Sequence, residues 1–222
     1  MIAIKRSRLA VVTASLSATL ALSACGPTND DIAHSESSTA MYQAYNDSMT
    51  KMHSEMMLGM GYNDPDSAFT QGMLGHHLGA VDMAKIQLKY GKDPEMLQLA
   101  QKIIDAQEVE IEQMQNWLNS HPDVAAPMAD TGAMQQAYAT GMNDMHGEMT
   151  LGITEPNPDM AFARGMLPHH RGAIDMAEVQ LEYGKDPEML QLAQEIIAAQ
   201  QPEIEQMQNW IKANGGVESN AQ

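Results

Sequence analysis

The chain of 222 residues combines an acidic composition with an unusual amount of methionine. It carries 29 Asp and Glu against 12 Lys and Arg, for a net charge of −17. Nucleic acid is therefore not an expected partner, because phosphate binding needs clustered positive charge. The chain contains 21 Met but only 2 Phe and 2 Trp. A thioether fills irregular cores and is also a soft metal ligand, so the composition favours metal ions as partners.

Residues 1–24 are predicted to be a lipoprotein signal peptide. A basic start precedes an uncharged run that is too short to span a bilayer as a mature helix. The run ends in Leu-Ser-Ala-Cys-Gly at 22–26, which resembles the lipobox of bacterial lipoproteins and implies lipidation of Cys25. The alternative is an ordinary cleavage site near Cys25. We expect a periplasmic or cell-surface protein, anchored to the membrane through this lipid.

An internal repeat organises the rest of the chain. Shifted by 93 residues, Met41–Leu118 aligns with Met134–Ile211 without a gap. The predicted organisation is therefore a flexible linker at 25–38, a first three-helix repeat at 39–119, a linker at 120–133, a second three-helix repeat at 134–213 and a flexible tail at 214–222.

Each repeat is predicted to form three helices, and no segment alternates with period two as a strand would. Start and stop signals in the first repeat place these helices at 39–60, from a cap at Asp66 or Ser67 to Tyr90, and from the Asp93 cap with Pro94 to Asn119.

The third helix of each repeat shows heptad spacing, which favours packing in a bundle. In the first repeat, one predicted seam is Leu97, Ile104, Ile111 and Leu118, and the other is Ala100, Gln107 and Met114. Two helix pairs would then surround one core. The glutamates of these helices are expected to form a solvated face with weak cation affinity; they are Glu110, Glu112, Glu203 and Glu205.

Methionine and histidine share helix faces in both repeats. The face of the first helix carries Met49, Met52, His53, Met56 and Met60, and its copy carries Met142, Met145, His146 and Met149. The face of the second helix carries Met73, His76 and Met83 with His77 at its edge, and its copy carries Met166, His169, Met176 and His170. Thioethers prefer Cu(I) or Ag(I), and imidazole also accepts copper. The alternative is that these stripes only fill the core.

The motif Phe-x-x-Gly-Met-Leu-x-His-His-x-x-Ala-x-x-Met-Ala, at 69–84 and 162–177, resembles a bacterial secreted family catalogued as domain of unknown function 305. The resemblance extends to the third helices, where it adds Met114 and Met207. It implies an all-α, ferritin-like four-helix bundle made from two repeated helix pairs, with an extra Met-rich helix before each pair. Some members resemble periplasmic copper-binding proteins, which implies copper as the bound ion.

The sequence as a whole predicts an exported protein that sequesters or transfers Cu(I). A copper exporter or another periplasmic copper protein is an expected partner, and no catalytic set is apparent. Two alternatives remain, a structural or interaction lipoprotein with a Met-rich core and a metal-dependent oxidase, which would need carboxylates beside the histidines. The candidate metal ligands are Met49, Met52, His53, Met56, Met73, His76, His77, Met83, Met114, Met142, Met145, His146, Met149, Met166, His169, His170, Met176 and Met207.

Overall fold

The computed structural model describes residues 29–122 and 126–217, and within these ranges it contains helices and no strands. This confirms the all-α prediction. The helices are α1 (Asn29–Gly59), α2 (Pro65–Tyr90), α3 (Pro94–Ser120), α4 (Thr131–Gly152), α5 (Pro158–Tyr183) and α6 (Pro187–Ala213).

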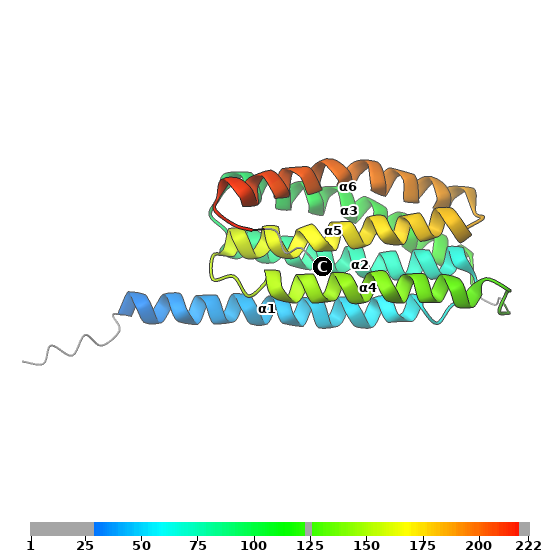
Figure 1. Ribbon diagram of the computed structural model, residues 1–222, viewed down its shortest axis with the longest axis horizontal. Coiled ribbons are helices and arrows are strands. Elements are labelled where there is room, and N and C mark those ends of the chain that lie inside the picture. Colours follow the sequence, from blue (N-terminus) through cyan, green and yellow to red (C-terminus); the bar gives the residue numbers. More distant parts are fainter. Residues whose placement is uncertain (1–28, 123–125, 218–222) are drawn as a thin grey trace, which may run out of the picture.

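The helices form three layers (Figure 1). α2 and α5 lie side by side in the middle layer, with α3 packed against α2 and α6 against α5 to complete a four-helix bundle. On the other side, α1 covers α2 and α4 covers α5. The predicted bundle of two repeated helix pairs, each preceded by a Met-rich helix, is therefore confirmed. Because the middle helices are covered on both sides, their side chains are the most deeply buried in the molecule.

The first helix is longer than the sequence predicted. α1 begins at Asn29, so the predicted flexible linker at 25–38 is helical over most of its length, and α1 projects beyond the bundle (Figure 1). Residues 29–38 contain neither Gly nor Pro, so nothing in them ends a helix. Likewise, α4 begins at Thr131, inside the predicted linker at 120–133.

The predicted signal peptide and Cys25 lie outside the described residues, as does the end of the predicted tail. Within 29–122 and 126–217, no helix is both long enough and apolar enough to cross a bilayer.

The cap of α2 is Asp64, so the prediction of Asp66 or Ser67 was wrong by two or three positions. The Asp64 carboxylate accepts a hydrogen bond from the Ser67 backbone N–H at 2.9 Å, and Pro65 takes the first helical position. Several cap-forming residues stand close together here, and only the position of Pro65 separates them. The prediction of Asp93 as the cap of α3 is confirmed.

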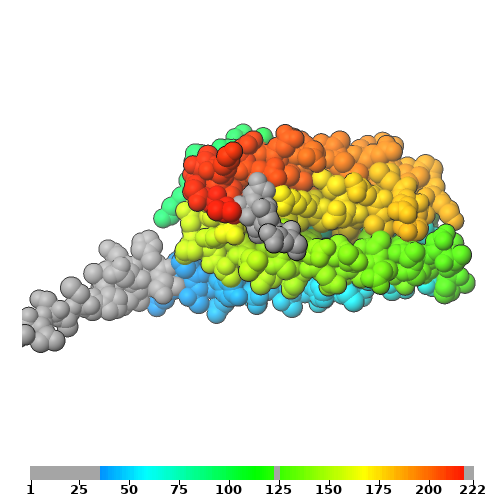
Figure 2. All heavy atoms as spheres, in the orientation of Figure 1, coloured from blue at the N-terminus to red at the C-terminus, as the bar shows by residue number. Residues whose placement is uncertain are grey.

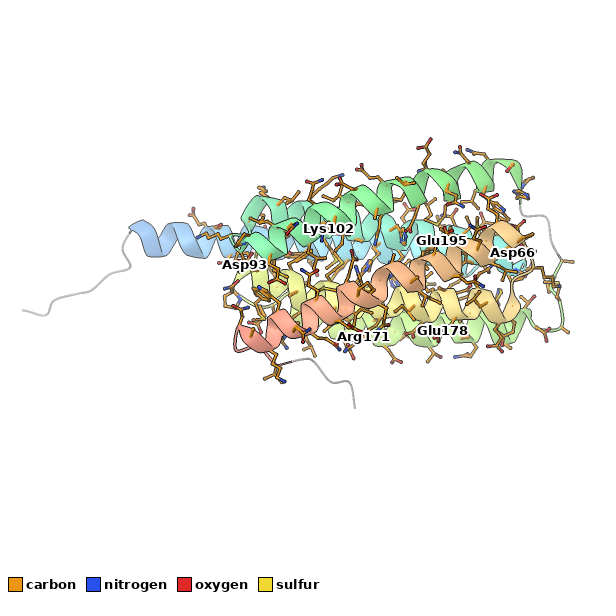
Figure 3. All side chains as sticks on the ribbon, turned by 90° about the horizontal axis from the view of Figure 1, so that it is seen from above. Asp66, Asp93, Lys102, Arg171, Glu178 and Glu195 are labelled. Atoms are coloured by element: carbon orange, nitrogen blue, oxygen red, sulfur yellow. The ribbon has the colours of Figure 1, made fainter. Side chains whose placement is uncertain are left out.

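Asp66 connects the two repeats instead of capping α2, and Asp159 does the same at the start of α5. Asp66 is buried. Its carboxylate accepts a hydrogen bond from the Gln180 side chain at 2.6 Å and one from the backbone N–H of Lys185, which follows α5. Asp159 likewise accepts from Gln87 at 2.6 Å and from the backbone N–H of Asp93 at 3.1 Å. Figure 3 shows Asp66 and Asp93 at opposite ends of the bundle, so the two repeats are joined at both ends.

The core-facing seam of α3 is rotated by one position from the predicted one. The seam of Ala100, Gln107 and Met114 is buried as predicted. The other column that faces the core is Met96, Ile103, Glu110 and Trp117 instead of Leu97, Ile104, Ile111 and Leu118, of which only Ile104 is buried. Both columns are largely apolar, so periodicity alone does not choose between them. The charged Glu110 in the observed column favoured the other column in the sequence, where all four residues are apolar.

Candidate metal-binding site

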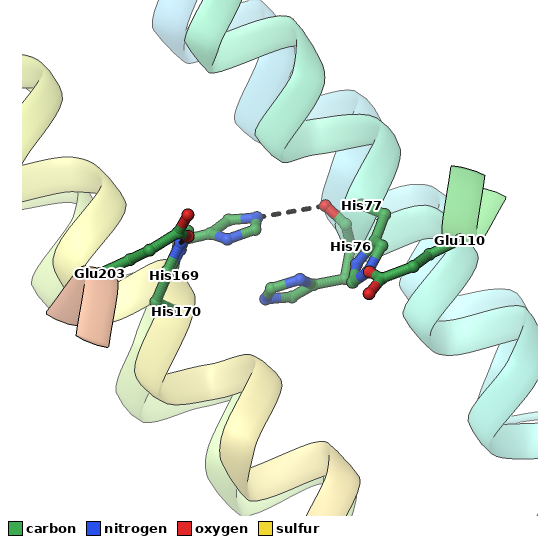
Figure 4. A network of polar contacts seen from close by, with 6 residues as sticks. All are labelled: His76, His77, Glu110, His169, His170 and Glu203. Carbon is green, nitrogen blue, oxygen red and sulfur yellow. Dashed lines mark hydrogen bonds and ion pairs between the residues drawn. The ribbon is translucent and has the colours of Figure 1, made fainter. Parts of the chain in front are cut away.

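Two pairs of adjacent histidines meet where α2 and α5 pack at the centre of the molecule (Figure 4). His76 and His169 face one another with ring centroids 3.6 Å apart, and both side chains are fully buried. The His169 Nε2–H donates a hydrogen bond to the backbone carbonyl of His76 at 3.1 Å. Within the part of the chain that the structure describes, neither ring nitrogen of His76 has a hydrogen-bond partner.

The second histidine of each pair turns outward to a glutamate of the neighbouring helix (Figure 4). His77 Nε2 donates to Glu110 Oε2 at 2.6 Å, and His170 Nε2 donates to Glu203 Oε2 at 2.8 Å. Both rings are fully buried, and the carboxylates are about one-fifth exposed, at 19% and 22%. The prediction of a solvated glutamate face was therefore wrong for Glu110 and Glu203. These carboxylates fix the tautomer and orientation of the rings.

Burial lowers the pKa of His76 and of His169 well below the ordinary value, and the neighbouring imidazoles lower both values further. Both rings are therefore neutral at pH 7.

The carboxylates that an oxidase would need do lie beside the histidines, but they are hydrogen-bonded to the rings. Among the described residues, no three His, Cys, Asp or Glu side chains converge in a way that could hold a metal ion.

The thioethers converge elsewhere, in a narrow pocket at the junction of α1, α2, α4 and α5. Met56 and Met60 reach it from the end of α1, Met142 from α4 and Met176 from α5, and Tyr138 completes its polar edge. The remaining lining residues are Gly59, Ala68 and Gly72.

Glycine makes this convergence possible. A Cβ at Gly59 would lie 2.6 Å from the backbone nitrogen of Gly72, so only glycine lets α1 approach α2 this closely. A Cβ at Gly72 would lie 3.1 Å from the Cε atom of Met176, so the absence of a side chain also makes room for this methionine from α5.

The other predicted ligands of the outer helices divide into two groups. His53 and His146 meet between α1 and α4, with ring centroids 5.7 Å apart, and Figure 2 shows these two helices along one side of the molecule. Met52 and Met145 instead pack against glycines of the middle layer. A Cβ at Gly79 or Gly172 would lie 2.5 or 2.6 Å from their sulfur atoms. This contact explains both methionines as packing residues.

The remaining predicted thioethers lie in the hydrophobic core. Met49 and Met149 are buried on the inner faces of α1 and α4. Fully buried in the middle and upper layers are Met73, Met83, Met114, Met166 and Met207. The structure thus brings Met56, Met142 and Met176 together in one pocket.

Met60 and Tyr138 line the pocket but were absent from the predicted ligands. Met60 follows Met56 by one helical turn on the predicted face, so this spacing could have identified it. Tyr138 is four residues before Met142, and its hydroxyl has no hydrogen-bond partner among the described residues. Burial raises its pKa, and the Asp66 carboxylate raises it further, so the phenol stays neutral.

A comparison with protein families identifies the domain. The family model of a domain of unknown function (DUF305) matches residues 66–211, which include all four central histidines. The chain belongs to this family. The match confirms the resemblance seen in the repeated His-His motif.

Solved structures of similar proteins include CopM in the Cu(I)-bound form, which is 33% identical to this DUF305 chain. The alignment has a TM-score of 0.52 and covers 68% of this chain and 98% of CopM. CopM has also been solved in apo, Ag-bound and Cu(II)-bound forms. A DUF305 protein from Streptomyces coelicolor, described as secreted, shares the fold at 23% identity, with a TM-score of 0.55 and coverage of 72% of this chain and 99% of that chain.

A curated relative covers much less of the DUF305 chain. An uncharacterized protein of Acanthamoeba polyphaga mimivirus is 45% identical over 49 residues. This match spans 22% of the present chain and 32% of the viral protein, about a third of its length.

Proposed function

We propose that this DUF305 protein is an exported binding protein for Cu(I), which it sequesters or transfers without catalysing a reaction. The observation that carries the proposal is the pocket in which Met56, Met60, Met142 and Met176 bring four thioethers together. These four methionines come from three different helices and line one narrow pocket. Soft cations such as Cu(I) and Ag(I) prefer such ligands.

The chemistry of the pocket suits binding followed by exchange. Thioethers are neutral, so they hold Cu(I) without the strong charge attraction that a thiolate would add. Tyr138 and the pocket methionines are neutral too, whereas the protein as a whole carries a charge of −17. This negative field raises the local concentration of cations. We infer that the field attracts the ion and that the sulfurs select it.

The likeness to CopM supports copper as the bound ion, because CopM has been solved with Cu(I), Cu(II) and Ag. CopM is 33% identical to this chain, and the alignment covers 98% of CopM. We infer from this similarity that the two proteins bind the same class of ion. The assignment of the ion to the four-sulfur pocket is our own and depends on the geometry of this chain.

Anaerobic titration of the protein with Cu(I), in competition with a Cu(I) chelator, tests the proposal. Replacing both Met142 and Met176 with leucine is expected to weaken binding of the first equivalent at least about tenfold, which is about 1.4 kcal/mol. The matched control replaces Met73 and Met166, two core thioethers outside the pocket, and should leave the affinity unchanged. Leucine conserves the volume of methionine, so both variants should fold.

A loss of affinity in the control variant instead of the pocket variant would place the ion beside the paired histidines and contradict the four-sulfur site. Absence of Cu(I) binding in every variant and in the parent would contradict the function itself. The structural alternative, in which methionine only fills the core, would then be favoured. Turnover with O₂ by the copper-loaded parent would favour the oxidase alternative.

We also propose export and lipid attachment at Cys25, because a basic start and an uncharged run precede the lipobox-like Leu-Ser-Ala-Cys-Gly at 22–26. Cells that express the full chain should incorporate labelled palmitate into the protein, and the Cys25→Ser variant should not be labelled. Equal labelling of the two proteins would argue against an anchor at Cys25.

A further inference from the structure

The four-sulfur pocket has a twin that the internal repeat creates. Each of its eight lining residues has a counterpart 93 positions away, and seven of the eight counterparts are identical. The exception is Met60, which becomes Ile153. The identical counterparts are Met149, Gly152, Ala161, Gly165, Tyr45, Met49 and Met83.

Four of the twin residues, Gly152, Gly165, Ile153 and Met83, lie against one another in the structure. A Cβ at Gly165 would lie 3.2 Å from the Cε atom of Met83, much as one at Gly72 would lie 3.1 Å from the Cε atom of Met176. The same Cβ at Gly165 would lie 3.1 Å from Cγ2 of Ile153. Isoleucine therefore stands beside the methionine of the twin, in the position that Met60 holds in the pocket.

The two places also differ in how far they are open to solvent. Met176 is 7% exposed, whereas its counterpart Met83 is completely buried. Met60 is partly exposed, whereas Ile153 is only 1% exposed. The branched alkyl group of isoleucine has no lone pair to offer a metal, and here it closes the space that a fourth sulfur would occupy.

On the basis of the proposed function, we propose that the duplicated fold carries two soft-ion sites of unequal strength. The strong site is the four-sulfur pocket at Met60. The weak site is its twin, where Met49, Met83 and Met149 supply three sulfurs and Ile153 replaces the fourth. Divergence at this one pair of equivalent positions makes the two otherwise matching sites unequal.

Exchange of the two diverged residues tests the proposal directly. In anaerobic Cu(I) titrations of the full protein, the parent should bind one equivalent tightly and a second one weakly. Met60→Ile should weaken the tight equivalent about tenfold, and Ile153→Met should strengthen the second equivalent about tenfold, each change being about 1.4 kcal/mol. Thermal unfolding without metal shows whether each variant is folded.

A double exchange, Met60→Ile with Ile153→Met, keeps the number of sulfurs constant and should move the tight site to the twin. Met142→Leu should then weaken tight binding in the parent but not in the double exchange. Met49→Leu should weaken tight binding in the double exchange but not in the parent. If Met60→Ile and Ile153→Met leave Cu(I) binding unchanged, the proposal of two unequal sites is wrong, whereas the proposed function stands. If the parent binds no Cu(I), the proposed function itself fails.

Discussion

Acidification of the metal-free protein from pH 6.5 to pH 5 is expected to remove at most about 3 kcal/mol of stability through His76 and His169 alone. Burial lowers the pKa of both imidazoles in the folded state, with the nearby histidines as a smaller cause. In the unfolded chain, their pKa returns to about 6.5. Below pH 6.5 the unfolded state therefore binds more protons than the folded state, and stability falls. Above about pH 7.5, where the imidazoles of the unfolded chain are also neutral, the contribution of these two groups is constant.

Denaturant unfolding followed by circular dichroism between pH 5 and pH 8 measures this effect. Other acidic groups also contribute to the pH dependence, so the informative quantity is the difference between variants. His76→Gln should reduce the slope of stability below pH 6.5 by about 1.4 kcal/mol per pH unit. His146→Gln, which replaces an exposed ring of the outer layer, is the matched control. The same slope in the parent and in His76→Gln would show that His76 titrates normally in the folded protein.

Asp66→Ala is expected to lower the free energy of unfolding by about 2–4 kcal/mol. The buried Asp66 carboxylate accepts the side-chain N–H of Gln180 at 2.6 Å and the backbone N–H of Lys185 at 3.0 Å. Removing the carboxylate leaves these donors without their acceptor and disconnects α2 from the turn between α5 and α6. Because the buried Asp66 carboxylate joins the two repeats at this end, Asp66→Ala should lower the free energy of unfolding more than the removal of a surface ion pair does.

Asp82→Ala is the matched control, since Asp82 forms a partly exposed ion pair with Lys51 at 3.1 Å. That change should alter stability by no more than about 0.5 kcal/mol. Asp66→Asn keeps an oxygen acceptor and should lose less stability than Asp66→Ala. Equal unfolding midpoints for Asp66→Ala and Asp82→Ala would mean that Asp66 does not join the repeats energetically.

The repeat and the bundle were predictable because their signals are redundant. Pro94 after Asp93 marks the start of α3, and the same pair recurs 93 residues later as Asp186 and Pro187. The start of α1 was less predictable, because residues 29–38 lack an apolar stripe even though nothing in them breaks a helix.

The details of the site depend on contacts between residues distant in the sequence. Glu110 looks like a solvated residue until His77, 33 positions earlier, is seen to donate to it. Asp66 has the chemistry of a helix cap, and its true partners lie more than 100 residues away. A helical wheel could place Met56 and Met60 on one face, but only the packing of α4 and α5 brings Met142 and Met176 to them.

X-ray absorption at the copper edge of the protein loaded with one equivalent of Cu(I) tests the four-sulfur site most directly. We expect a first coordination shell made of sulfur, which is lost or reduced when Met142 and Met176 are both replaced with leucine. A first shell dominated by nitrogen, unchanged in that variant, would place the ion on the histidines and contradict the four-sulfur site.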